Sequence, residues 1–155
     1  MKSSIDNIAV IGLGVIGTGW IIRFLYNQKK IKVYDPNIEQ KKNLLKEIKR
    51  VEPTLKKIYK KKINLLKQLE FSKSLKDAVE NADLIQENAP ENENLKKNLI
   101  EEISEYSKIN SIIASSSSGL LPSKIQSKCK NPKRLIIAHP FNPVYLLPLV
   151  ELVAG

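Results

Sequence analysis

This chain of 155 residues has little cysteine, histidine and arginine, and it has no long hydrophobic run. Cys129 is the only cysteine, so an internal disulfide is impossible and a zinc site built on cysteines is excluded. No apolar stretch approaches the length of a membrane span, and Met1–Asn7 carries no apolar signal-peptide core. We therefore expect a cytoplasmic protein that has no membrane contact and binds no metal.

The charge of the chain is strongly one-sided, with 26 Lys and Arg against 16 Asp and Glu, a formal net charge of +10. The lysines gather between Lys41 and Lys67, where they alternate with apolar residues at helical spacing, and aromatic residues do not interleave with them. This pattern indicates a solvated helix face above an apolar stripe, so we expect no nucleic-acid partner and keep that reading as a minor alternative. The stripe consists of Leu44, Leu45, Ile48, Leu55 and Ile58.

Three glycines follow the first apolar run, 8–11, in the spacing G-x-G-x-x-G. The first glycine permits a tight turn, the second lets the backbone approach phosphates, and the third lets the next helix lie close to the strand. The N-terminus of that helix presents free N–H groups to an anion. The pattern is weak alone, but a strand, a helix and an acidic residue accompany it as a dinucleotide site requires. The expected cofactor contacts here are Gly12, Gly14, Val15, Ile16 and Gly17.

The acidic residue is Asp35, which ends the second apolar run, 31–34. Its carboxylate can accept hydrogen bonds from the adenosine ribose hydroxyls and would repel a 2′-phosphate. The segment 36–39 contains no arginine that could bind such a phosphate, so we expect NAD rather than NADP. Asp35 with Pro36 and Asn37 also fits a turn that caps the next helix, and the two interpretations are compatible.

Strand and helix patterns alternate along the whole chain, which has the length of one domain. Repeated strand–helix units imply a parallel sheet that is covered on both faces. We therefore expect an α/β fold of the Rossmann type, with a doubly wound, mainly parallel sheet. The expected strands are 8–11, 31–34, 70–72, 84–87, 111–114, 135–138 and 149–153, and the expected helices are 15–27, 39–69 with a break near Pro53, 74–81, 91–106 and 122–126.

The only histidine, His139, directly follows an apolar run, and such a histidine is often a packed or capping residue. The segment 139–144, His-Pro-Phe-Asn-Pro-Val, and the Leu-Val-Glu at 149–151 change this interpretation. Together with the glycine motif, the segment 86–91 and the serine run 115–118, they resemble the 3-hydroxyacyl-CoA dehydrogenase family. The resemblance covers essentially the whole chain and is strongest for the branch that acts on L-carnitine.

The resemblance implies that His139 is the general base that takes the proton of the substrate hydroxyl, a task that suits an imidazole because it titrates near neutral pH. Glu151 would orient this ring and stabilise its protonated form, although an exposed glutamate on a strand is the plainer interpretation. Glu91 and Lys96 match cofactor-contacting positions, but they also fit an ordinary charged helix. The residues that the resemblance makes catalytic are His139, Glu151, Ser118 and Asn142, and those it adds to the cofactor site are Glu91, Lys96 and Ser116.

Two features depart from the family pattern. Ser116 stands where the family has an asparagine near the nicotinamide, and a serine makes a weaker bridge. The chain also stops at Gly155, whereas family members continue into a helical domain that supplies a further catalytic asparagine, much of the substrate pocket and the dimer interface. We therefore expect residues 1–155 to be the NAD-binding domain, with an exposed apolar tail at 146–150. The isolated domain should bind NAD(H) with little catalysis.

The implied reaction is oxidation of the 3-hydroxyl of L-carnitine, or of a related small 3-hydroxy acid, to the ketone by hydride transfer to NAD. One alternative substrate is 3-hydroxyacyl-CoA, for example 3-hydroxybutyryl-CoA. Another alternative is a non-catalytic NAD-binding module or fragment. A trimethylammonium group would favour aromatic faces and CoA would favour basic groups, but such determinants are expected beyond Gly155. In the full-length family the protein is expected to be a homodimer.

Overall fold

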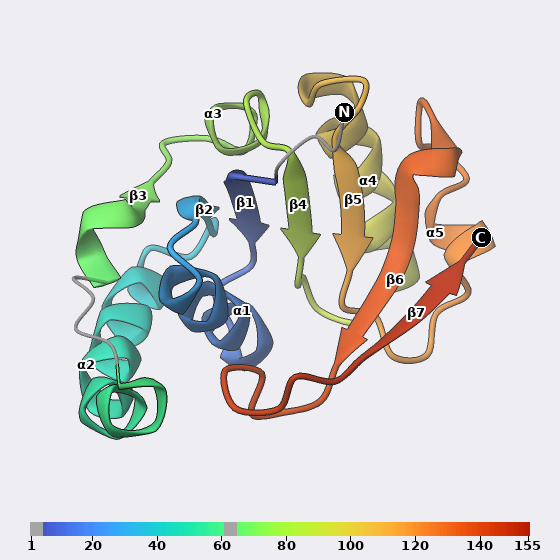
Figure 1. Ribbon diagram of the computed structural model, residues 1–155. Helices are drawn as coiled ribbons and strands as arrows, with labels where there is room; N and C mark the ends of the chain where they lie inside the picture. Colours follow the sequence, from blue (N-terminus) through green and yellow to red (C-terminus); the bar gives the residue numbers. More distant parts are fainter. Residues whose placement is uncertain (1–4, 61–64) are drawn as a thin grey trace.

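The structure is a computed structural model that describes residues 5–60 and 65–155 (Figure 1). Its elements alternate between strands and helices along most of the chain, as the sequence patterns predict. In order, they are β1 (Asn7–Ile11), α1 (Val15–Tyr26), β2 (Lys30–Tyr34), α2 (Glu39–Tyr59), the 3-10 helix η1 (Leu65–Gln68), β3 (Leu69–Phe71), α3 (Leu75–Val79), β4 (Leu84–Glu87), α4 (Glu93–Tyr106), β5 (Ile112–Ser115), α5 (Pro122–Ile125), the 3-10 helix η2 (Pro132–Arg134), β6 (Leu135–Pro140) and β7 (Val150–Ala154).

The described strands form one seven-stranded sheet in the order β3-β2-β1-β4-β5-β6-β7 (Figure 1). Neighbouring strands are parallel except for β6 and β7, which are antiparallel. The chain winds outward from β1 to β3 and then crosses back to β4 before it winds outward to the other edge. The expected doubly wound α/β fold is therefore confirmed. Sheets of this kind bind ligands at the carboxyl ends of the strands where the winding reverses, here between β1 and β4.

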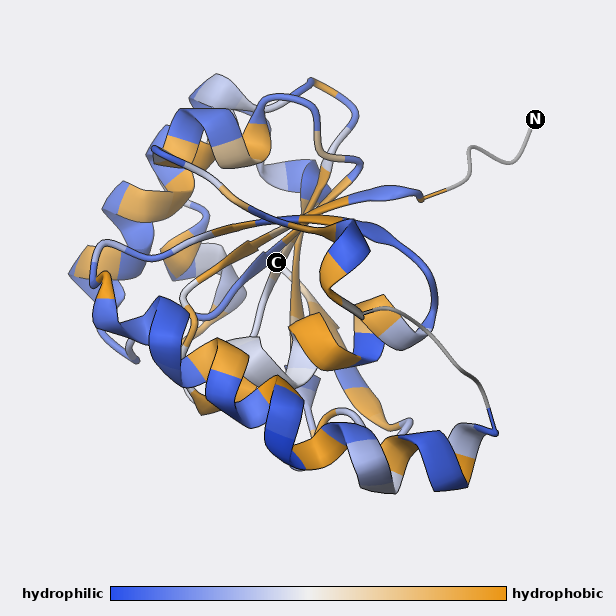
Figure 2. Ribbon diagram, turned by 90° about the vertical axis from the view of Figure 1, so that its left-hand side faces the viewer, coloured by the Kyte–Doolittle hydropathy of each residue, from blue (hydrophilic) through white to orange (hydrophobic). Residues whose placement is uncertain are grey.

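Successive residues of β1 point to opposite faces of the sheet and enter two separate cores. Ile8 and Val10 pack with α1 and α2, whereas Ala9 and Ile11 pack with α3, α4 and α5. Because both faces are covered, β1 is an uninterrupted apolar run rather than an alternating one. In Figure 2 the strands in the middle are mostly orange, and the long helix α2 shows blue and orange segments.

Helix α2 runs without interruption from Glu39 to Tyr59, so the expected break near Pro53 is wrong. Proline lacks an N–H group and normally disrupts a helix interior. Pro53 lies on the exposed side, while Val51 and Leu55 on the opposite side are buried. Packing before and after the proline holds the helix together, and water can reach the carbonyl group that loses its partner. The expected apolar stripe is otherwise present, except that Ile58 is 54% exposed.

Each of the five expected helices differs from the observed helix by at least one residue at an end. The expected continuation of the second helix to Leu69 crosses residues 61–64, which lie outside the described residues, and a 3-10 helix follows them. Helix α4 begins at Glu93 rather than Glu91, because the side chain of Asn92 accepts a hydrogen bond from the Leu95 amide and so caps the helix. None of the described helices combines the length and the apolar character that crossing a bilayer requires.

The expected exposure of the apolar tail is present. Leu147 is 44% exposed and Leu149 is 56% exposed, and Leu152 in the edge strand β7 is 69% exposed. Exposed apolar side chains in such a row are typical of a surface that another protein segment covers.

Candidate functional site

The glycine turn has the close packing that its spacing predicts. Gly12 has a φ of +86°, which favours glycine, and a Cβ there would lie 2.7 Å from the carbonyl oxygen of Asn88. A Cβ on Gly17 would lie 1.9 Å from the carbonyl oxygen of Gly12. By contrast, nothing lies within 4 Å of a Cβ built on Gly14. The first and third glycines are therefore required by the protein itself, whereas the second leaves open space for a ligand.

Helix α1 begins at this open space without a side-chain cap. Its N-cap residue is Gly14, and its first turn contains no acidic residue. Val15 is 74% exposed at the head of the helix, and Ile16 is half-buried behind it. The free N–H groups and the positive end of the helix dipole make this terminus suitable for a phosphate group.

A cavity of about 750 Å³ lies beside the turn, between the ends of β1 and β2 and helix α4. Asp35 lies in its wall, where one carboxylate oxygen accepts a hydrogen bond from the Leu13 amide at 2.8 Å and the other from the Asn37 amide at 2.8 Å. The expected turn after Asp35 is thus present, and the carboxylate is fixed at the cavity wall. The N-cap residue of α2 is Ile38, which makes no side-chain cap bond, and the Glu39 amide donates instead to the side-chain oxygen of Asn37 at 3.0 Å. The open space at Gly14 and the uncapped start of α1 fit the pyrophosphate of a dinucleotide, and the cavity with Asp35 in its wall fits the adenosine.

His139 and Glu151 are directly opposite each other on the antiparallel strands β6 and β7. The imidazole Nδ1 lies 2.9 Å from the carboxylate Oε2 of Glu151, so the expected pairing of the two side chains is present. The carboxylate accepts the proton on Nδ1, which leaves the lone pair of Nε2 free to act as a base. The His139 side chain is 32% exposed and therefore accessible.

The connection between β6 and β7 packs against helix α1. Val144 is buried, and a Cβ on Gly19 would lie 2.9 Å from the Val144 side chain. Asn142 lines a cavity of about 490 Å³ together with Leu13 and Gly14 of the glycine turn and with residues of α1 and α2. This places the loop after His139 on the same edge of the sheet as the glycine turn. Gly19 was not among the predicted site residues, although it follows Gly17 by only two positions.

Glu91 holds the serine loop in place. Its Oε1 accepts hydrogen bonds from the Ser117 hydroxyl and from the amides of Ser118, at 3.0 Å, and Gly119, at 2.9 Å. Burial raises the pKa of Glu91, but these hydrogen bonds and the positive charge of Lys96 outweigh it, so the pKa is lowered. The carboxylate stabilises the loop at neutral pH, and this contribution is lost as the pH falls through the lowered pKa. Ser118 itself is exposed.

Lys96 is buried inside the molecule, with a side chain only 1% exposed. Its ammonium group lies 2.8 and 3.0 Å from the two carboxylate oxygens of Glu87, which is fully buried, and 2.9 Å from the carbonyl oxygen of Ala89. Glu87 also accepts a hydrogen bond from the Ser115 hydroxyl. The plain interpretation of Lys96 as an ordinary exposed helix residue is therefore wrong. Its expected contact with the cofactor stays a prediction.

Ser116 also faces inward, where its hydroxyl contacts Trp20, Gln86 and Asn88. Trp20, Gln86, Glu87 and Asn88 are further site-forming residues that were not among the predicted site residues, although residues 86–91 carried part of the family resemblance. Their long-range partners have no signal in the local sequence.

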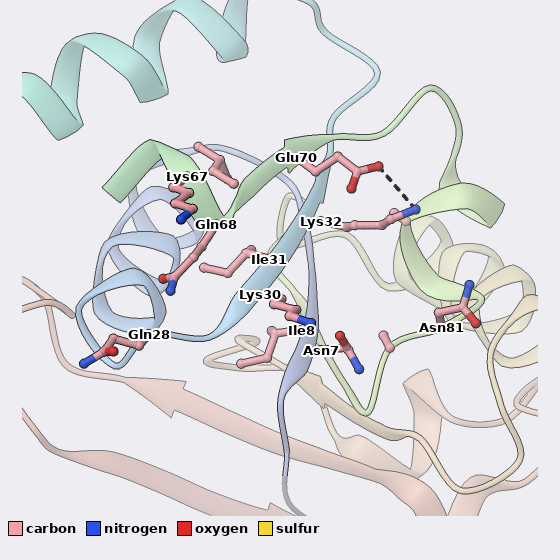
Figure 3. A pocket seen from close by; sticks show the side chains of 13 residues that line it. Asn7, Ile8, Gln28, Lys30, Ile31, Lys32, Lys67, Gln68, Glu70 and Asn81 are labelled. Carbon is pink, nitrogen blue, oxygen red and sulfur yellow. Dashed lines mark ion pairs between the residues drawn. The ribbon is translucent and has the colours of Figure 1, made fainter. Parts of the chain in front are cut away.

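A further cavity, of about 540 Å³, opens at the opposite edge of the sheet (Figure 3). It is lined by residues at the N-terminal ends of β1 and β2, among them Asn7 and Lys30. Within it, Lys32 pairs with Glu70 at 3.4 Å (Figure 3). Lys32 also pairs, at 2.6 Å, with Asp77, which does not line the cavity. Since this cavity lies away from the glycine turn, it is not part of the candidate site.

The fold and the site define a dinucleotide-binding domain. The chain belongs to the 3-hydroxyacyl-CoA dehydrogenase family: residues 7–155 match the model for "3-hydroxyacyl-CoA dehydrogenase, NAD binding domain". The cofactor of this domain is NAD. The expected family, fold and cofactor are thus confirmed.

Several relatives are similar to nearly the whole chain. The L-carnitine dehydrogenase of Bacillus cereus is 46% identical over 99% of this chain and 47% of that protein. The L-carnitine dehydrogenase of Oceanobacillus iheyensis is 44% identical over 96% of this chain and 48% of that protein. Among solved structures, (S)-3-hydroxybutyryl-CoA dehydrogenase from Ralstonia eutropha superimposes with a TM-score of 0.90 at 26% identity, over 98% of this chain and 55% of that one. The chain spans about half the length of the curated relatives it matches.

Proposed function

We propose that the protein containing this domain oxidises the 3-hydroxyl of L-carnitine, or of a closely related 3-hydroxy acid, to the ketone. The observation that carries this proposal is the His139–Glu151 pair, which lies at the same sheet edge as the glycine turn. The identity of 40–46% to several L-carnitine dehydrogenases supports the substrate.

In the proposed mechanism, bound NAD supplies a hydride acceptor. The uncapped start of α1 binds the pyrophosphate, and Asp35 binds the adenosine ribose. Nε2 of His139 takes the proton of the substrate hydroxyl, and Glu151 holds the ring in the tautomer that makes this possible and stabilises the charge that results. Ser118 and Asn142 would bind the reacting hydroxyl or the nicotinamide end of the cofactor.

The rest of the site is proposed to come from the part of the relatives that has no counterpart here. That part would cover the exposed apolar tail, complete the substrate pocket and supply the dimer interface. The whole protein would be a homodimer and would work in the cytoplasm. The isolated chain would then bind NAD(H) but turn over slowly. A 3-hydroxyacyl-CoA substrate is the second candidate, supported by solved neighbours such as the 3-hydroxybutyryl-CoA dehydrogenase of Escherichia coli, at 26% identity.

The cofactor preference is tested with Asp35→Asn, which removes the charge but keeps the size of the side chain. The wild-type chain is expected to bind NADH much more tightly than NADPH in calorimetric titrations. The variant should bind NADH roughly tenfold more weakly, because hydrogen bonds to a charged acceptor are lost, and should discriminate less against NADPH.

Glu39→Gln is the matched control for Asp35→Asn, because it also removes one negative charge near the start of α2. The Glu39 carboxylate pairs with Lys42 and does not line the cavity that contains Asp35. Its affinities should remain within about twofold of wild type. If Asp35→Asn and Glu39→Gln behave alike, Asp35 has no direct part in binding the ribose.

A further inference from the structure

A cluster of four polar side chains lies behind the glycine turn, and Ser116 is at its centre. The Ser116 hydroxyl accepts hydrogen bonds from the indole N–H of Trp20 at 3.1 Å and from the side-chain amide of Gln86 at 2.8 Å. It donates to the side-chain oxygen of Asn88 at 2.8 Å. A serine hydroxyl has one proton and two lone pairs, so these three contacts use its whole capacity.

The cluster joins elements that are far apart in the sequence. Trp20 lies in α1, where its ring stacks on the ring of Phe24 with 5.2 Å between the two centroids. Gln86 lies in β4, and Ser116 directly follows β5. Trp20 and Gln86 are buried, so each donor would lack a partner if the serine hydroxyl were absent. The cluster therefore fixes the distance between α1 and the carboxyl ends of β4 and β5.

Asn88 connects this cluster to the cofactor cavity. Its side-chain nitrogen donates to the carbonyl oxygens of Ile11, at 3.2 Å, and Gln86, at 3.1 Å, and Asn88 also lines the cavity beside Gly12. The same nitrogen would lie 3.3 Å from a Cβ on Gly17. Any movement of Asn88 thus changes the wall of the glycine turn.

We infer that Trp20, Gln86, Ser116 and Asn88 are positioning residues that shape the site toward the nicotinamide end, and that Ser116 acts through its neighbours rather than by touching the cofactor. This inference rests on the proposed function, since it presumes that NAD binds at the glycine turn. Gln86 and Ser116 lie on the β4 and β5 side of the turn, whereas Asp35 lies on the β2 side, and of the four residues only Asn88 lines the cavity that contains Asp35. Loss of the cluster should therefore weaken binding of the whole dinucleotide more than binding of its adenosine half.

The test compares NADH with ADP, which lacks the nicotinamide half, in calorimetric titrations of the 155-residue chain and its variants. Ser116→Ala is expected to weaken NADH binding at least about tenfold, because three hydrogen-bond partners are left without the hydroxyl. ADP binding should fall by a clearly smaller factor, since its diphosphate would also bind at the glycine turn beside Asn88 but ADP has no nicotinamide half. Gln86→Leu should act in the same direction. Ser116→Thr keeps the hydroxyl and should restore most of the NADH affinity.

Ser111→Ala is the matched control, since the Ser111 hydroxyl also donates a hydrogen bond, to the Ala82 carbonyl, but at the far edge of the sheet. Ser111 is buried and Ser116 is half-buried, so the control removes a hydroxyl that is at least as well shielded from water. It should change neither affinity by more than about twofold. Equal weakening of NADH and ADP by Ser116→Ala, or unchanged NADH binding, would overturn the inference. Failure of the wild-type chain to bind NADH would instead refute the proposed function, so the two failures are distinguishable.

Discussion

Replacing His139 with alanine is expected to lower turnover of a 3-hydroxy substrate by about 10²–10⁴-fold, the range that a positioned general base contributes. The affinity for NADH should change little, because the glycine turn and Asp35 are built from other elements. The assay uses a fusion of this chain with the C-terminal half of the Bacillus cereus L-carnitine dehydrogenase. The region of that enzyme that this chain replaces is 46% identical to the chain. L-carnitine and 3-hydroxybutyryl-CoA are compared as substrates.

Glu151→Gln should also lower turnover, since a side-chain amide can donate to Nδ1 and so favour the wrong tautomer of His139. The NADH affinity is the internal control in each variant: a variant that has lost it reports a folding defect rather than a catalytic one. Unchanged turnover in His139→Ala would remove the histidine from the mechanism and favour a non-catalytic NAD-binding module.

Replacing Lys96 with methionine is expected to destabilise the chain by about 3–5 kcal/mol, because it leaves the carboxylate of Glu87 buried without its counter-ion. Both side chains are almost completely buried, at 1% and 0% exposure, so water cannot replace the lost partner. Urea unfolding followed by circular dichroism measures the change. A chain that does not fold at all is the extreme form of the same result.

Lys97→Met is a closely matched control, since it removes the same side chain one position further along α4. Lys97 pairs with Glu93 on the partly exposed side of the helix, so its loss should cost no more than about 0.5 kcal/mol. The double variant Glu87→Gln with Lys96→Met should recover part of the stability, because a neutral amide replaces the unpaired charge. Equal losses in the two lysine variants would contradict the buried pair.

The parts of the site that could be predicted are those in which local sequence determines geometry. The first glycine of the motif is expected to make a tight turn, and Gly12 has the positive φ of such a turn. The residue after a parallel strand must lie at the carboxyl edge of the sheet, and Asp35 lies there in the cavity wall. The pairing of His139 with Glu151, twelve residues later, was predicted from the family resemblance. The antiparallel register of β6 and β7 explains the pairing, because it places the two residues directly opposite each other.

The parts that could not be predicted depend on burial. Whether a proline ends a helix depends on packing at both sides, as at Pro53. Lys96 looked like one more exposed lysine because its partner, Glu87, lies on another element and no spacing rule joins them. The contacts of Ser116 with Trp20 and Gln86 span 96 and 30 positions, which only the folded chain brings together.

The most direct test of the account follows the nitrogen resonances of the imidazole in the 155-residue chain, since His139 is its only histidine. Titration with NADH is expected to shift the Nε2 signal saturably, with the same dissociation constant as calorimetry gives, because the ring lies at the edge of the sheet where the nicotinamide should bind. ADP, which fills only the adenosine end, should shift it much less. If NADH saturates the chain while both imidazole signals stay unchanged, His139 does not lie at the nicotinamide, and the central claim is wrong.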